Sequence, residues 1–311
     1  MKERVFWIKW SIICAGIFSI IFYVYVYEGN TIDQTVSSTT NPLLTEIKEK
    51  AATYEEAPED AYIDSVYKKT PGRNGRKVNV QKSYAKMKKK NQFDETKLVF
   101  DSISPKVSLN DLEASPIYRA HPKKQMVGLM INVSWGTEHI PSILAILKEK
   151  NVQATFFIEG KWAQENKDIL KMIHEENHLI GNHAYNHPDM ARISETEMKK
   201  QIIQTNEIIE AIIGESPHYF APPSGSFNDQ VVEIAHDLNM ETILWTVDTV
   251  DWQNPTVSVM INRVMKDIHP GAMILMHPTV PVAQGLDELI EKIKQEELKL
   301  GTIKQLLSES R

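Results

Sequence analysis

Short apolar segments alternate with longer amphipathic segments from Met126 to about residue 305, and this alternation limits the fold more than any other feature. Val127–Ile131 and Ala154–Ile158 are typical of buried strands, and the residues between them repeat an apolar side chain every three or four positions, as a helix does. Strands that alternate with helices over such a length form a parallel sheet. We therefore predict an α/β domain over residues 126–305, either an open sheet or a distorted (β/α) barrel.

The amino terminus carries a long apolar segment. Residues Trp10–Tyr27 are apolar or small throughout, and Lys2, Arg4 and Lys9 precede them. Their length reaches the lower limit for a membrane-spanning helix, and the small-residue cleavage pattern of a signal peptide does not follow. The basic flank predicts that the main domain is extracytoplasmic. We expect residues 1–27 to anchor the protein in the membrane; a cleaved signal segment, and hence secretion, is the alternative.

Between the anchor and the α/β domain the sequence is polar and divided. Residues 28–60 are interpreted as a polar spacer with a short helix at Leu43–Tyr54. Residues 61–100 are interpreted as a small α/β module with a helix-like stretch at Ile63–Tyr67. A second spacer is expected at 101–125. We assign no chemistry to the small module.

Composition excludes several classes of function. With 35 Lys+Arg against 41 Asp+Glu the net charge is −6, so the chain lacks the basic excess that nucleic-acid binding needs and we predict no nucleic-acid partner. Cys14 is the single cysteine, which excludes an internal disulfide framework and a Cys-rich metal site. The ten histidines are therefore the main candidates for metal or acid–base chemistry.

Functional side chains follow the predicted strands. In parallel α/β folds the ligand site lies at the carboxyl ends of the strands. We therefore expect histidines, carboxylates and tryptophans to meet at one rim of the sheet. The segments that follow the strands are Asn132–Gly136, Asn182–Pro188, Ala221–Gly225, Asp248–Trp252 and His277.

Two of these histidines have the spacing of a metal site. His183 and His187 are four residues apart, so a helical turn would place both imidazoles on one face, where they could share a metal. The same spacing also arises by chance in structural histidines.

Two further residues suggest acid–base chemistry. His277, at the end of an apolar strand, is either a hydrogen-bonded core histidine or a general acid or base. Asp251 either caps a turn or orients a neighbouring histidine and raises its pKa.

Taken in order, these strings resemble the motifs of the polysaccharide deacetylases, the NodB homology domain of carbohydrate esterase family 4. The resemblance rests on Gly181-Asn-His183-x-x-x-His187-Pro, Pro222-Pro-x-Gly225, Val247-Asp-x-x-Asp251-Trp252 and Leu275-x-His277. The first motif, Asn132-Val-Ser-Trp-Gly136, is similar to that of a branch found in spore-forming bacteria. The resemblance implies a distorted (β/α) barrel that uses a divalent metal to hydrolyse N-acetyl groups on cell-wall or related glycans.

The resemblance also implies a role for each matched residue. His183 and His187 would bind the metal, Zn²⁺ or Co²⁺. His277 would be the general acid and Asp251 its partner. Substrate-binding residues would be Pro223, Ser224, Trp252 and Leu275.

The sequence departs from the family motifs at catalytic positions. Asn132 stands where the motif has the general-base Asp, and the metal-binding Asp is absent because Val133 and Ser134 follow. Ala221 replaces the Arg that orients the base. An amide cannot accept a proton at neutral pH, and a site without a carboxylate binds metal weakly.

We therefore predict a metal-dependent hydrolase of the polysaccharide deacetylase family with impaired turnover. Its substrate would be the N-acetyl groups of cell-wall glycan, of the peptidoglycan or spore-wall type. The alternative is a catalytically inactive deacetylase-like protein that binds glycan or acts as a scaffold. The expected partners are N-acetylated cell-wall glycan and, through the amino-terminal helix, the membrane.

Overall fold

The computed structural model describes residues 41–311, and the segment Trp10–Tyr27 that is predicted to anchor the protein lies outside them. Within the described residues, no helix is both long enough and apolar enough to cross a bilayer. The membrane anchor therefore stays a prediction from the sequence.

The described chain forms two compact units. The smaller contains residues up to Lys50 together with Val80–Leu98, and the larger contains Ala51–Asn79 together with Val99–Arg311. The module expected at 61–100 and the spacer expected at 101–125 do not coincide with these units.

Strand pairing explains the difference. In the larger unit, β3 (Gly75–Val78) pairs antiparallel with β4 (Phe100–Ile103). Most of the chain between these two strands is consequently an insertion that belongs to the smaller unit.

The smaller unit is helical. Helix α2 (Pro42–Tyr54) begins in it, which confirms the short helix predicted there, and α3 (Val80–Met87) and the 3₁₀ turn η1 (Glu95–Lys97) complete it. Asn41 Nδ2 donates a hydrogen bond to the Tyr84 hydroxyl at 2.9 Å. This bond connects the start of α2 to α3.

The helix-like stretch Ile63–Tyr67 is wrong as a prediction, because it is part of a β-hairpin. In the larger unit β1 (Tyr62–Asp64) pairs antiparallel with β2 (Lys68–Thr70). The Asp64 carboxylate accepts hydrogen bonds from the backbone N–H groups of Val66 and Tyr67, both at 2.8 Å. Such local bonding by an Asp side chain competes with helix formation and favours a turn.

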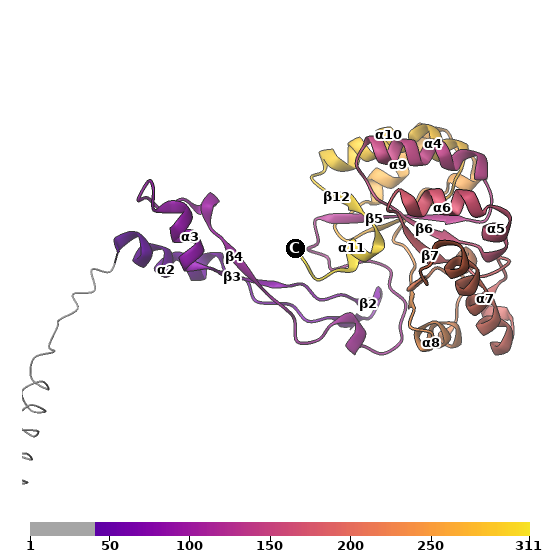
Figure 1. The fold of residues 1–311 in the computed structure, drawn as a ribbon, viewed down its shortest axis with the longest axis horizontal. Coiled ribbons are helices and arrows are strands. Elements are labelled where there is room, and N and C mark those ends of the chain that lie inside the picture. Colours follow the sequence, from indigo (N-terminus) through magenta and orange to yellow (C-terminus); the bar gives the residue numbers. More distant parts are fainter. Residues whose placement is uncertain (1–40) are drawn as a thin grey trace, which may run out of the picture. The chain divides into compact units, whose positions relative to one another are not determined.

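An eight-stranded sheet of parallel strands forms the body of the larger unit and curls into a distorted half-barrel (Figure 1). Along the sheet the order is β10, β11, β5, β6, β7, β8, β9, and β12 pairs with the start of β5. This confirms the predicted fold class. The strands are β5 (Met126–Val133), β6 (Thr155–Ile158), β7 (Leu179–Asn182), β8 (Tyr219–Phe220), β9 (Glu241–Thr242), β10 (Val247–Asp248), β11 (Met273–Met276) and β12 (Lys299–Gly301).

Helices pack around the outside of the curled sheet (Figure 1). They are α4 (Ile140–Glu149), α5 (Gly160–Glu165), α6 (Lys167–Glu175), α7 (Glu195–Ile213), α8 (Asp229–Asp237), α9 (Val257–Asp267) and α10 (Val280–Gln295). The short helix α11 (Ile303–Leu307) instead packs against the interior side of the sheet. The 3₁₀ turns of this unit are η2 (Leu109–Asp111), η3 (Thr137–His139), η4 (Met190–Arg192), η5 (Pro223–Gly225) and η6 (Asp251–Gln253).

The pleat of the strands divides the core in two. Alternate residues of a strand point to opposite faces of the sheet. Ile131 and Val133 of β5 pack in a large cluster with helix residues such as Leu147 and Leu289. Met130, which directly precedes Ile131 and points to the opposite face, packs in a separate interior cluster inside the curled sheet. The interior cluster is closed by large side chains, so the sheet encloses a packed core rather than a pore.

The segment Ile117–Ala120, ahead of β5, bridges the two sides of the curled sheet. The Ile117 N–H donates to the Thr242 carbonyl at 2.9 Å, and the Ala120 N–H donates to the Gly271 carbonyl at 2.8 Å. Both Ile117 and Ala120 are fully buried. The fold therefore includes residues that lie outside the predicted domain of 126–305.

A buried ion pair ties the β1–β2 hairpin to the sheet. Lys69 of β2 is fully buried, and its Nζ lies 2.7 Å and 2.9 Å from the two carboxylate oxygens of Glu241 in β9. A buried ammonium without a partner is strongly unfavourable. The pair therefore fixes the position of the hairpin on β9.

Candidate active site

The residues predicted at the strand ends share the interior side of the curled sheet. Asn132 follows Met130 by two residues in β5, and His277 follows Leu275 by two residues after β11. Met130, Leu275 and Ala221 all belong to the interior cluster. Because parallel strands end at the same edge of a sheet, the pleat alone brings these side chains to one rim.

His183 and His187 come together, although the residues between them are not helical. Their ring centroids lie 5.2 Å apart with the planes at 69°. Ala184 and His187 have φ values of 61° and 57°, in the left-handed region, so the chain forms an irregular loop. The predicted pairing of the imidazoles is found, but the predicted helical turn is wrong.

The environment of His183 fixes the state of its ring. The side chain is buried, and Nδ1 lies 2.7 Å from the carbonyl oxygen of Ala221. A carbonyl can only accept, so Nδ1 carries the hydrogen and Nε2 presents a lone pair. Burial, with a smaller effect of His187, lowers the pKa of His183 to about 3, which keeps the ring neutral.

Asp251 and His277 form a buried hydrogen-bonded pair. His277 Nδ1 donates to Asp251 Oδ1 at 2.9 Å, and the His277 backbone N–H donates to Oδ2 at 2.8 Å. The hydroxyls of Thr249 and Thr279 each donate to the same carboxylate at 2.9 Å. With Nδ1 occupied, Nε2 of His277 is the nitrogen that remains for a reacting group.

The surroundings of Asp251 keep it ionised. Its side chain is fully buried. Burial alone would raise its pKa, but the hydrogen bonds and the charge of His277, together with the Thr279 hydroxyl, outweigh burial and hold the pKa below its ordinary value. A permanent carboxylate at this place favours one tautomer and one orientation of the His277 ring.

The predicted substrate-binding residues fall into two groups. Pro223 and Leu275 are buried, whereas Ser224 and Trp252 are exposed. The Trp252 indole, directly after Asp251 in η6, has 56% of its surface exposed. It is therefore available to contact a ligand beside the Asp251–His277 pair.

One polar atom at the end of β5 lacks a partner. The buried Oδ1 of Asn132 makes no hydrogen bond within residues 41–311. Buried polar groups are nearly always paired, so each such atom marks a place where a partner is missing. Ala221, at the end of β8, contributes only a methyl group to the interior cluster.

Comparisons with known proteins assign the family. A family model described as polysaccharide deacetylase matches residues 119–243. The chain is 34% identical over 193 residues to the peptidoglycan-N-acetylglucosamine deacetylase of Bacillus cereus, which covers 60% of this chain and 70% of that protein. It is 46% identical over 289 residues to the uncharacterized protein YlxY of Bacillus subtilis, which covers 93% of this chain and 90% of that protein.

A solved structure agrees with this assignment. The crystal structure of BA3943 from Bacillus anthracis, described as a CE4 family pseudoenzyme, matches with a TM-score of 0.84 and 51% identity over 86% of this chain and 96% of that chain. The chain belongs to the polysaccharide deacetylases of carbohydrate esterase family 4. A mutant of BA3943 that is described as having restored enzymatic activity matches with a TM-score of 0.84 and 50% identity, over 86% of this chain and 99% of that chain.

One unpaired atom lies at a position that the sequence singles out. The first motif predicts that Asn132 replaces the general-base Asp and that the metal-binding Asp is missing at Val133–Ser134. The buried Oδ1 of Asn132 has no hydrogen-bond partner within the described residues.

The metal that the deacetylase family implies is only partly matched by the residues present. His183 offers a neutral ring with Nδ1–H bound to a backbone carbonyl, an arrangement that metal-binding imidazoles use. However, within the described residues no group of three or more His, Cys, Asp or Glu side chains is placed to hold a metal. The described residues therefore offer imidazole nitrogens as metal ligands, but not the carboxylate that would complete the metal site.

Three residues of this rim were missed by the sequence analysis. Thr249 and Thr279 complete the hydrogen bonds of Asp251, and their signal was only a Thr two residues before Asp251 and two after His277. Glu159 directly follows β6 and is 8% exposed, and burial raises its pKa. The position of Glu159 directly after a predicted strand was the sequence signal that could have identified it.

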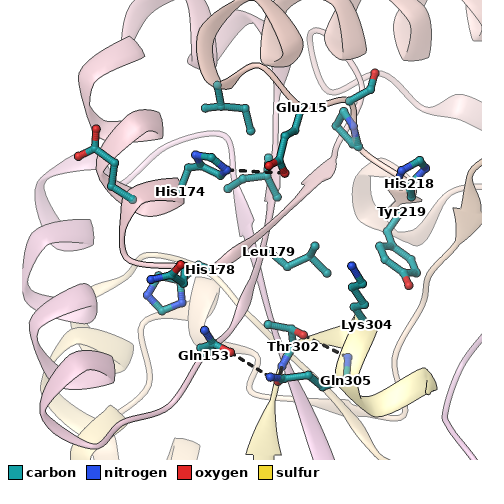
Figure 2. Close-up of a pocket in the computed structure, with 16 residues that line it drawn as sticks. Gln153, His174, His178, Leu179, Glu215, His218, Tyr219, Thr302, Lys304 and Gln305 are labelled. Atoms are coloured by element: carbon teal, nitrogen blue, oxygen red, sulfur yellow. Dashed lines mark hydrogen bonds and ion pairs between the residues drawn. The ribbon is translucent and has the colours of Figure 1, made fainter. Parts of the chain in front are cut away.

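A cavity of about 980 Å³ lies at the opposite end of the sheet (Figure 2). Its lining includes Gln153, His178 and Tyr219, which stand at or just before the starts of β6, β7 and β8. His178 Nδ1 accepts from the Ala154 N–H at 3.1 Å, and burial lowers its pKa to about 4, so this neutral ring serves the fold. The cavity contains none of the predicted site residues.

Proposed function

We propose that this chain is a deacetylase-like protein that binds N-acetylated cell-wall glycan and has lost most of its hydrolytic activity. The observation that carries the proposal is Asn132, whose buried amide has an unpaired Oδ1 and which would stand at the general-base position by its place in the first motif. An amide cannot take the proton of an attacking water at neutral pH. Ala221 cannot replace the guanidinium that would orient a base.

Binding residues support retention of a substrate groove. Trp252 remains exposed beside the Asp251–His277 pair, and Ser224 is exposed on η5. Together with Pro223 and Leu275 they would hold the sugar and its acetyl group. Because these residues need no general base to act, glycan binding can persist after turnover is lost.

Residual hydrolysis is the second candidate function, and the Asp251–His277 pair favours it. With its Nδ1 bound to Asp251, His277 could hold a proton on Nε2 and donate it to the departing amine. A bound divalent metal would polarise the amide carbonyl. If His277 acts as the general acid and no residue acts as the general base, removal of a proton from the attacking water would be the slow step.

Two measurements on the same preparation separate the candidates. We expect N-acetylglucosamine oligomers to bind by calorimetry, while acetate release stays near background with and without added Zn²⁺ or Co²⁺. Turnover at the rate of a complete peptidoglycan deacetylase would contradict the proposal. Absence of both binding and turnover would contradict both candidate functions and favour a scaffold role.

We further propose that His183 and His187 bind a divalent metal weakly. Imidazole nitrogens suit Zn²⁺ or Co²⁺, and the missing carboxylate leaves more coordination positions to water. Zinc titration by calorimetry should detect one weak site per chain, and the His183→Ala, His187→Ala double variant should abolish it. His174→Ala, which changes a histidine away from the rim, is the matched control. If the double variant binds zinc as the wild type does, these histidines are structural.

We also propose that the larger unit lies outside the cytoplasmic membrane, held by the Trp10–Tyr27 segment. The basic residues before that segment support this orientation. Protease added to intact, wall-stripped cells should digest the chain after Tyr27. Digestion that requires cell lysis would reverse the orientation, and recovery from the medium of a chain that lacks the segment would indicate secretion.

A further inference from the structure

The Trp135 indole lies open to solvent against the imidazole of His277. The two rings are nearly parallel, at 9°, with centroids 5.9 Å apart, and 46% of the Trp135 surface is exposed. Four tryptophans fall within residues 41–311, and Trp162 and Trp245 are buried or partly buried. The two that are exposed, Trp135 and Trp252, both follow strand ends of the candidate active site.

The residues directly after Trp135, Gly136 and Thr137, are held in place by neighbouring parts of the chain. Gly136 has φ 72°, and a Cβ at this position would overlap the carbonyl oxygen of Pro278. A side chain is therefore excluded by the close approach of the loop to the residue after His277. On α5, Trp162 Nε1 donates to the Thr137 hydroxyl at 2.8 Å. Both features restrict the backbone next to Trp135, and stacking on His277 orients the indole before any ligand binds.

A purely structural role explains this geometry poorly. An indole that served only to pack would be expected to bury most of its surface, because large aromatic side chains gain stability by leaving water. Trp135 instead uses one ring face against His277 and leaves much of the remainder open. The open part is a rigid, uncharged, polarisable plane at the rim.

The exposed indole of Trp135 favours one class of ligand. It carries no charge that could pair with a charged ligand, and its apolar ring face matches the C–H face of a pyranose ring. With the net charge of −6, a polyanion is a poor match.

We propose that Trp135 is a specificity-determining residue that stacks against a pyranose ring of the glycan and places the adjoining N-acetyl group next to His277. The inference rests on the proposed glycan binding and deepens it, since it names the contact that sets affinity. It predicts that affinity depends on the flat aromatic face rather than on the indole nitrogen.

The test is a titration of the detergent-solubilised full chain with the N-acetylglucosamine tetramer, followed by calorimetry and tryptophan fluorescence. We expect Trp135→Ala to raise Kd by about 10-fold or more, as truncation of a central aromatic contact does. Trp135→Phe keeps a flat ring and should stay within about threefold of the wild type. Met172→Ala, which removes an exposed apolar side chain on α6, is the control and should leave Kd unchanged.

The outcomes separate this inference from the proposed function. If the wild type binds the tetramer and Trp135→Ala binds it equally well, the stacking role is wrong and glycan binding stands. If the wild type does not bind, the proposed function fails and the inference fails with it. An unchanged unfolding midpoint in Trp135→Ala, together with loss of the glycan-induced fluorescence change, would assign the effect to contact rather than folding. Equal losses in the Phe and Ala variants would contradict stacking.

Discussion

The double substitution Asn132→Asp, Ala221→Arg is expected to raise acetate release from N-acetylated glycan by about 10²–10⁴-fold over the wild-type chain, with Zn²⁺ or Co²⁺ supplied. The Asp would accept the proton of the attacking water. The Arg would hold that carboxylate with two parallel hydrogen bonds, which Lys could not do. The measurement is acetate released per chain at saturating glycan.

Each single substitution should give much less. Asn132 is 4% exposed and Ala221 is fully buried in an apolar cluster, so either change alone buries a charge without its partner. An unoriented carboxylate near a metal would also tend to bind the metal instead of accepting a proton. The double variant should therefore exceed the product of the single effects.

Other results would contradict this assignment. Wild-type activity that equals that of complete deacetylases, and that either substitution leaves unchanged or lowers, would show that the base lies elsewhere. A more stable double variant without activity would support the Asp–Arg pair, but would locate the limiting defect at Val133–Ser134, where the metal-binding carboxylate is missing.

Replacing Asp251 should cause the largest loss of stability. Its buried carboxylate accepts four hydrogen bonds, from the hydroxyls of Thr249 and Thr279 and from the ring Nδ1–H and backbone N–H of His277. Asp251→Ala would leave these donors buried and unpaired, so we expect the free energy of unfolding to fall by about 3–5 kcal/mol at neutral pH. Urea unfolding measures the change, and the exposed Asp237→Ala variant should stay within about 0.5 kcal/mol of the wild type.

The contribution of Asp251 to the free energy of unfolding should depend on pH. The pKa of Asp251 is lower in the folded chain than in the unfolded chain. Its contribution is therefore fully present above the unfolded value of about 3.9 and is lost as pH falls through the folded pKa. The difference between wild type and Asp251→Ala should shrink at low pH. A difference that stayed constant across that range would mean that the carboxylate charge does not stabilise the fold.

Much of the fold could be predicted because its central strands are buried. β5, β6 and β11 consist mainly of Val, Ile, Leu, Met and Phe, and such segments between helices are typical of buried parallel strands. β12, with only three residues, is too short to show a pattern. The β1–β2 hairpin was missed because Asp64 forms the turn with its own neighbours, and the apolar residues around it imitate helical spacing.

The site could be predicted as a set of residues but not as a geometry. Strand ends located Asn132, His183 and His277, since parallel strands end together. The left-handed conformation of Ala184 could not be foreseen, because alanine does not favour it. The unpaired Oδ1 of Asn132 depends on which groups other strands bring nearby, and that is a property of packing rather than of local sequence.

The Ile117–Ala120 segment has a practical consequence for defining the smallest fragment that folds. A fragment that begins at Met126 would keep every family motif and lose the groups that satisfy the backbone at Thr242 and Gly271. It would also uncover one side of β9, and an unpaired strand edge recruits strands from other molecules. Self-association of such a fragment would therefore report a missing edge partner, and would be easily mistaken for oligomerisation of the native protein.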